Sequence, residues 1–402
     1  MHCKFIPLLY DHTSEIFRHC EEATGRRGNP DWIASLRSND DNTNMQLITK
    51  NHHAITLWLC LCLALVAGMV LVGGYTRLSG SGLSITEWNP IHGTIPPLNI
   101  DEWQEEFDAY RASPQYEKIN KGMTLDEFKT IFWPEYWHRV LGRIIGIVFL
   151  FPLLFFAATR SISKSFFSRL TGIFALGGLQ GLMGWVMVAS GLVDNPYVSH
   201  IKLAMHLSLA FLIFALILWA ILDVIKNSSP RRGEAGRGAL NAQSEQISPL
   251  PNPPPAGEGI FVCWFTLLCM QIILGALLAG LHGGLVYNTW PDMNGQFLPD
   301  GALDTGQYHI ENIGLIQFLH RKVAILLAVG FLLWWFYNKN YVKNKGLGKE
   351  CIGVTLVLFA QFALGVLTLL HHVPLPLALM HQMTALLLFA VSVVLLYGIK
   401  HK

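Results

Sequence analysis

Long apolar runs alternate with polar connections along the chain, and this alternation predicts the fold. Eight runs of about 20 residues or more are apolar enough to cross a bilayer as helices. Their approximate bounds are Ala54–Gly74, Tyr136–Ala158, Phe167–Gly191, Val198–Ile225, Ile260–Leu281, Ile313–Tyr337, Cys351–His371 and Leu375–Ile399. We therefore predict an all-α membrane protein with eight transmembrane helices.

Polar stretches divide the chain into parts. Residues 1–50 predict a polar N-terminal tail, which has no signal-peptide pattern. We expect a long polar loop over Tyr75–Glu135. Residues 226–259 are rich in Pro, Gly and Ser, a composition typical of a disordered linker. This linker separates an N-terminal four-helix half (51–225) from a C-terminal four-helix half (260–402).

The two halves repeat one order of elements: helix, long loop, helix beginning with His-Arg, helix, and helix with an embedded histidine. Shorter echoes support the repeat, namely Met205-His206 with Met380-His381, and Gln180-x-x-x-Gly184 with Gln361-x-x-x-Gly365. Each half has an even number of spans, so both halves share one orientation. We expect two pseudo-symmetric four-helix bundles related by an axis along the membrane normal.

The distribution of charge predicts orientation and excludes one class of partner. Hydrophobic residues make up 52% of the chain and charged residues only 14%, against about 25% in a soluble domain. No basic patch is interleaved with aromatic residues, so we expect no nucleic-acid binding. Lys and Arg gather on one set of connections and at the C-terminus. The positive-inside rule places both termini in the cytoplasm and the two long loops outside.

Seven cysteines occur without a C-x-x-C pair, and none lies in the long loops. A zinc site, a c-type haem attachment and a disulfide framework are therefore disfavoured. We expect the cysteines to act as small apolar residues in or near helices.

Four histidines carry the main chemical prediction. His138 and His320 lie near the outer starts of the second and sixth runs, while His206 and His381 lie about two turns inside the fourth and eighth. A polar group inside a spanning helix is costly and marks a functional site. Histidines at matched depth on neighbouring helices can ligate a haem iron from both sides. An interhelical hydrogen bond or an interfacial anchor is the alternative for any single histidine.

One carboxylate distinguishes the two halves. Glu135 precedes His138 by three residues, so the two side chains share a helix face. Gln317 occupies the matching place before His320. This asymmetry predicts one reactive site and one that only carries electrons. The alternative is an interfacial carboxylate favoured by a helix N-terminus.

Arginines near the same membrane face are candidates for binding anions. The guanidinium fork suits carboxylates, and each haem carries two propionates. Snorkelling at the interface is the alternative for each of them. The candidates are Arg77, Arg139, Arg143 and Arg321.

Four motifs resemble the haem A synthase family, over about residues 54–399 apart from the linker. They are Gly73–Ser84, Glu135–Arg139, Tyr287–Met293 and Gln317–Arg321. The sequence is similar to the proteobacterial and mitochondrial branch, because it lacks the outer-loop cysteine pair of the other branch.

The resemblance implies an oxidoreductase that converts the C8 methyl group of haem O to the formyl group of haem A by stepwise hydroxylation. It implies a resident haem b on His320 and His381, with Arg321 beside it. It places the haem O substrate on His138 and His206. Substrate binding would also involve Arg77, Arg139 and Arg143, and Glu135 would be catalytic.

The resemblance also implies a bacterial inner membrane, with the haem sites toward the outer face. Haem O synthase and assembly factors of the terminal oxidase are the expected partners, and a homo-oligomer is left open. The residues themselves leave a second reading, a di-haem b-type cytochrome in quinol-linked electron transfer. A haem transporter would need a through-path that the sequence does not show.

Overall fold

The computed structural model describes residues 48, 50–87, 92–193, 196–228, 256–304 and 309–401. The expected N-terminal tail lies outside these residues, apart from Ile48 and Lys50, and so does 229–255 of the expected linker. The regular elements of the described chain are all helices.

Eight long helices confirm the all-α prediction. Each is long and apolar enough to cross a membrane, so the chain is a multi-pass membrane protein. They are α3 (His52–Leu78), α6 (Leu125–Ala158), α7 (Lys164–Ala189), α8 (His200–Ser228), α9 (Ala256–Gly280), α10 (Ile313–Tyr337), α12 (Gly348–Leu370) and α13 (Leu375–His401). Short helices lie in the connections: α4 (Ile100–Arg111), α5 (Pro114–Lys118), α11 (Lys339–Asn344), η1 (His92–Thr94) and η2 (Gly283–Leu285).

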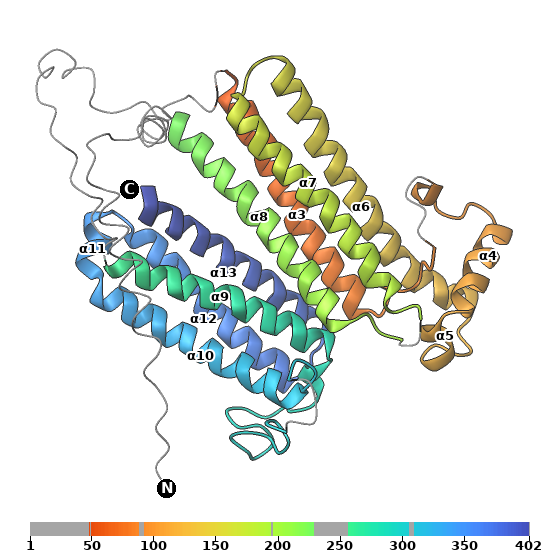
Figure 1. Ribbon diagram of the computed structural model, residues 1–402. Helices are drawn as coiled ribbons and strands as arrows, with labels where there is room; N and C mark the ends of the chain where they lie inside the picture. Colours follow the sequence, from red (N-terminus) through yellow and green to blue (C-terminus); the bar gives the residue numbers. More distant parts are fainter. Residues whose placement is uncertain are drawn as a thin grey trace, which may run out of the picture. The chain divides into compact units, whose positions relative to one another are not determined.

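The long helices pack mainly against their neighbours in sequence. In the N-terminal half α3 packs against α6 and α8, and α7 packs between α6 and α8. In the C-terminal half α10 packs against α9 and α12, and α12 packs against α13 (Figure 1). Contacts of α8 with α9, and of α13 with α3 and α8, join the two sets of helices.

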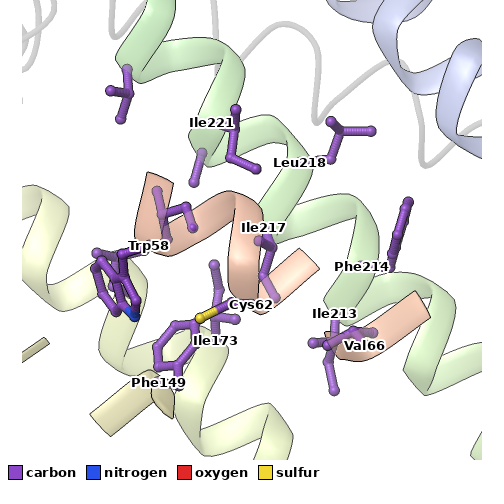
Figure 2. Packing of buried hydrophobic residues seen from close by; sticks show 14 of the residues in the cluster. Trp58, Cys62, Val66, Phe149, Ile173, Ile213, Phe214, Ile217, Leu218 and Ile221 are labelled. Carbon is purple, nitrogen blue, oxygen red and sulfur yellow. The ribbon is translucent and has the colours of Figure 1, made fainter. Parts of the chain in front are cut away.

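Large apolar side chains fill the space between α3, α6, α7 and α8. Trp58 and Cys62 of α3 lie between Phe149 of α6 and Ile217 of α8 (Figure 2). The indole of Trp58 donates a 2.8 Å hydrogen bond to the Val148 carbonyl, so its one polar atom is satisfied. The same cluster includes side chains of α13, so the two halves share part of one core.

The expected polar loop over Tyr75–Glu135 is wrong in part, because most of this stretch is helical. Helix α3 continues to Leu78, and α4 and α5 follow. Helix α6 begins at Leu125 rather than Tyr136. Its start is fixed by Thr124 and Glu127, whose side chains and backbone groups cap each other reciprocally.

Aromatic side chains make this extension of α6 stable outside the apolar span. Phe128 and Phe132 are buried against Phe107 and Tyr110 of α4. The Tyr110 and Phe128 rings are stacked with centroids 5.2 Å apart. Polarity along the sequence concealed this small core, because charged residues surround its aromatic ones.

The bounds of the other long helices differ from the predicted bounds by a few residues. At the linker, α8 continues to Ser228 and α9 begins at Ala256. The helices therefore take both ends of the stretch 226–259 that we expected to be disordered.

Candidate functional site

The four predicted histidines lie on four different helices. His138 is on α6, His206 on α8, His320 on α10 and His381 on α13, and all four are half-buried. His206 and His381 are each the seventh residue of their helix, as the predicted two turns require. Among the described residues, no three His, Cys, Asp or Glu side chains form a group that could hold a metal ion.

The histidines are brought together in two pairs. The His206 ring interacts electrostatically with His138, and the His320 ring with His381. The members of each pair lie on different helices. Each pair therefore brings imidazoles of two different helices near each other.

A glycine of a neighbouring helix supports each histidine ring. A Cβ atom added at any of these glycines would lie 2.9–3.1 Å from a ring atom, closer than side chains pack. The glycines are Gly73 of α3 for His138, Gly184 of α7 for His206, Gly275 of α9 for His320 and Gly365 of α12 for His381. The rings therefore lie directly against backbone, which restricts the space around each of them.

The two pairs approach each other across α3 and α13. Gln382, the residue after His381, donates a 2.7 Å hydrogen bond to the Val70 carbonyl of α3. A Cβ atom at Gly74 would lie 2.5 Å from the Gln382 side chain. Adjacent glycines of α3 therefore contact both sites, Gly73 on the His138 side and Gly74 on the His381 side.

Glu135 lies in the interior of α6, not at a helix start, so the alternative of a carboxylate favoured by a helix N-terminus does not apply. It is 2% exposed. One carboxylate oxygen accepts from the Ser84 hydroxyl at 2.8 Å and the Ile85 amide at 2.9 Å. The other accepts from the Arg139 guanidinium at 2.6 and 3.2 Å.

Arg139 and Arg321 hold the loops before α6 and α10 in the same way. Arg139 donates through Nη2 to the Ile85 carbonyl at 2.7 Å and through Nη1 to the Glu87 carbonyl at 3.0 Å. Arg321 donates through Nη2 to the Tyr287 carbonyl at 2.6 Å and through Nη1 to the Thr289 carbonyl at 2.8 Å. Each guanidinium thus bridges two carbonyls that are two residues apart, and Arg321 also donates through Nη1 to the Asp292 carbonyl at 2.7 Å.

The residue one turn before each of these arginines differs between the halves. Gln317 donates a 3.0 Å hydrogen bond to the Tyr287 carbonyl, whereas Glu135 accepts from the Ile85 amide. Glu135 forms an ion pair with Arg139, and neutral Gln317 cannot do so with Arg321. The asymmetry seen in the sequence is therefore also an asymmetry in how the loops are held.

The other two predicted arginines lie nearby. Arg143 is half-buried one turn after Arg139 on α6. Arg77 is in the last turn of α3, and no hydrogen bond or ion pair from another described residue reaches its guanidinium. His282 lies in the connection between α9 and α10, and burial and the charge of Arg77 together lower its pKa. Arg77 is thus a cation near the boundary between the two halves.

Sequence reasoning missed several residues that shape the site. Ser84 and Ile85 donate hydrogen bonds to Glu135 from a loop about fifty residues earlier, and no local sequence pattern predicts this contact. A repeated sequence motif could have predicted Gln271 and three of the supporting glycines. Gln271-x-x-x-Gly275 is a third copy of the echo found at Gln180 and Gln361.

Comparison with known proteins decides the family. A family model described as cytochrome oxidase assembly protein, COX15-CtaA, matches residues 56–393. The chain belongs to this family.

Curated relatives agree over most of their length. "Heme A synthase" of Parvibaculum lavamentivorans is 44% identical over 346 residues, which cover 85% of this chain and 93% of the relative. The protein of the same name from Nitrosomonas eutropha is 43% identical over 349 residues, covering 86% and 93%. That of Nitrosospira multiformis is 42% identical over 342 residues, covering 84% and 91%. The resemblance to haem A synthases is therefore confirmed, and the di-haem cytochrome reading gains no support.

The described cysteines fit the branch of the family without an outer-loop cysteine pair. All five are free thiols in long helices: Cys60, Cys62, Cys263, Cys269 and Cys351. Cys3 and Cys20 lie outside the described residues.

Proposed function

We propose that the protein is a haem A synthase, which oxidises the C8 methyl group of haem O to the formyl group of haem A. The observation that carries the proposal is the arrangement of four histidines as two glycine-supported pairs inside a membrane-spanning fold. Family membership supports the reaction, and the helices supply the apolar surroundings that a haem substrate needs.

The residues present fit haem. A haem held by two histidines takes one imidazole from each of two helices, and the two pairs would supply these. Among the described residues, no third His, Cys, Asp or Glu side chain joins either pair, which fits that set of donors. The Nδ1 atoms of His206, His320 and His381 are buried without a hydrogen-bond partner. A buried polar atom without a partner is costly, which favours a bound group at these positions.

The two pairs would have different tasks. His320 and His381 would hold a resident haem b, and His138 and His206 would hold the haem O substrate. The resident haem would supply one-electron redox chemistry. The contact of Gln382 with Val70 supports this division, because it brings the helices of the two sites together.

Glu135 and Arg139 would act on the substrate side. The Glu135 carboxylate holds Arg139 and the Ser84–Glu87 loop in place at the His138 end of α6. We assign Glu135 to catalysis chiefly through this positioning, with the ion pair fixing the charge beside the reacting edge of haem O. The methyl group would be hydroxylated in two successive steps, each of which adds one oxygen atom and removes two electrons that an external acceptor takes up, and water would leave the geminal diol.

Arginines would bind the haem propionates. Arg77 is the strongest candidate on the substrate side, since no described residue neutralises its charge. Arg143 would assist it from α6. Arg139 and Arg321 already bridge loop carbonyls, so they would act beside a haem while they hold the loops.

The orientation of the protein in the membrane and its partners are part of the same proposal. Both termini would be cytoplasmic, and the haem sites would lie toward the outer face of a bacterial inner membrane. Haem O synthase would supply the substrate, and assembly factors of the terminal oxidase would receive the product.

Haem analysis of cells tests the reaction. We expect cells that produce haem O and this protein to accumulate haem A and its hydroxylated intermediate, which reversed-phase chromatography of extracted haems separates. Cells with the haem O source alone are the control. If both oxidised haems are absent while the protein is in the membrane, the enzyme proposal is wrong.

Replacing Glu135→Gln tests the substrate-side carboxylate. Glutamine keeps the shape and one acceptor oxygen but loses the ion pair with Arg139. We expect bound haem to be retained and the haem A yield to fall about 10- to 100-fold, the factor that one charge-assisted hydrogen bond carries. Glu117→Gln removes an exposed i,i+4 pair with Lys121 and is the matched control. A wild-type yield from Glu135→Gln would reject this role.

Replacing His320→Ala or His381→Ala tests the resident haem. Each variant should lose the low-spin haem spectrum of the purified protein, because one axial ligand is missing. His372→Ala, in the nearby loop, should leave it unchanged. Persistence of the spectrum in either ligand variant would show that the resident haem is held elsewhere.

A further inference from the structure

The glycines that support the histidines belong to a pattern with one exception. In three of the four cases, glutamine stands four residues before the glycine, one turn away on the same helix face. The three pairs are Gln180 with Gly184, Gln271 with Gly275, and Gln361 with Gly365. Before Gly73, the glycine that supports His138, the residue is Met69.

In the second half, the glutamine ties two helices together at the histidine. Gln271 of α9 donates a 2.9 Å hydrogen bond to the backbone carbonyl of His320 on α10. The Gly275 contact lies one turn further along α9. His320 is thus held by backbone contact against its ring and by a hydrogen bond at its main chain.

In the first half, Gln180 of α7 donates the same kind of hydrogen bond, at 3.1 Å, to the His206 carbonyl. The place equivalent to Gln271, four residues before the glycine that supports His138, has no such bond. A thioether cannot donate a hydrogen bond, and no other described side chain donates to the His138 carbonyl. Met69 instead packs against α6, where its methyl carbon lies 3.2 Å from the position of a Cβ at Gly142. This is an apolar, adaptable contact.

The orientation of the imidazole ring also separates His138 from the other three histidines. His206, His320 and His381 all present Cε1 to their glycine, at 3.1, 3.0 and 2.9 Å from the added Cβ. His138 presents Nε2 at 3.1 Å and Cδ2 at 3.5 Å instead. His138 is therefore the one histidine of the four that turns Nε2 rather than Cε1 toward its glycine.

We propose that Met69 makes the first site exchangeable: among the described residues, α3 donates no hydrogen bond to the His138 carbonyl, so this ligand can move to admit haem O and release haem A. Gln271 does the opposite in the second site and retains the resident haem. This inference rests on the proposed division of labour between the sites. It identifies a residue that positions an axial ligand, not one that takes part in the oxidation.

Exchanging the two residues tests the inference on the intact protein. Protein carrying haem O or haem A in the first site and haem B in the second is mixed with excess apomyoglobin, which takes up released haem. Reversed-phase chromatography of the apomyoglobin fraction identifies the haem that has moved, so each site is followed by its own species. The variants are Met69→Gln and Gln271→Met. Met270→Gln, beside Gln271 and 54% exposed, controls for the added amide.

The two variants should have opposite effects. Met69→Gln should slow the release of haem O and haem A by about three- to tenfold, a factor within reach of one added hydrogen bond. Gln271→Met should speed the release of haem B by a similar factor, and Met270→Gln should change neither rate. The Soret spectrum before mixing confirms that each variant carries haem.

Unchanged release from both variants would overturn the inference, and so would faster release from Met69→Gln. If Met69→Gln does not fold, the rate of haem B release from Gln271→Met decides whether the inference stands. The proposed function fails separately: it is wrong if haem A never forms, whatever the release rates. If wild-type protein forms haem A but the substitutions at Met69 and Gln271 leave the rates of haem release unchanged, only the exchange inference is wrong.

Discussion

Direct contact between histidine rings and helix backbone is the constraint on which the proposed site depends. Four helices come close enough to a neighbour to place an imidazole against a glycine, where a Cβ would intrude at 2.9–3.1 Å. Small residues allow such approach in a membrane, where apolar burial gives helices little reason to associate. Because the helices meet at these points, the site and the helix packing are one feature. A larger residue at Gly184 or Gly365 would displace a proposed ligand, His206 or His381, and at the same time separate two helices.

The loops before α6 and α10 depend on a second constraint, the need to satisfy polar groups at the end of an apolar span. Arg139 bridges two backbone carbonyls and Arg321 three, which fixes each loop against the helix that carries a proposed haem ligand. In the second loop, hydrogen bonds from the Thr289 hydroxyl and the Gly295 backbone lower the pKa of Asp292. The loops are thus held by specific bonds, and the residues that hold them adjoin His138 and His320.

The sequence predicted features that repeat along the chain with a regular period. Eight apolar runs of sufficient length gave the eight spans, and the repeated His-Arg pairs indicated where the candidate sites lie. Patterns failed where distant side chains decide the structure. The start of α6 was missed because its apolar face packs on α4, and the partners of Glu135 were missed because they lie about fifty residues away in a loop. The role of Met69 could not be predicted, because the contrast with Gln271 appears only once Gln271 is seen to bind the His320 carbonyl.

The central claim is that two histidine pairs hold two haems with different tasks. Electron cryo-microscopy of the protein purified with haem O tests it most directly. The account predicts one haem between His138 and His206, carrying the long side chain of haem O or haem A, and a haem b between His320 and His381. A haem O bound between His320 and His381, or a haem ligated by a different residue such as His282, would contradict it.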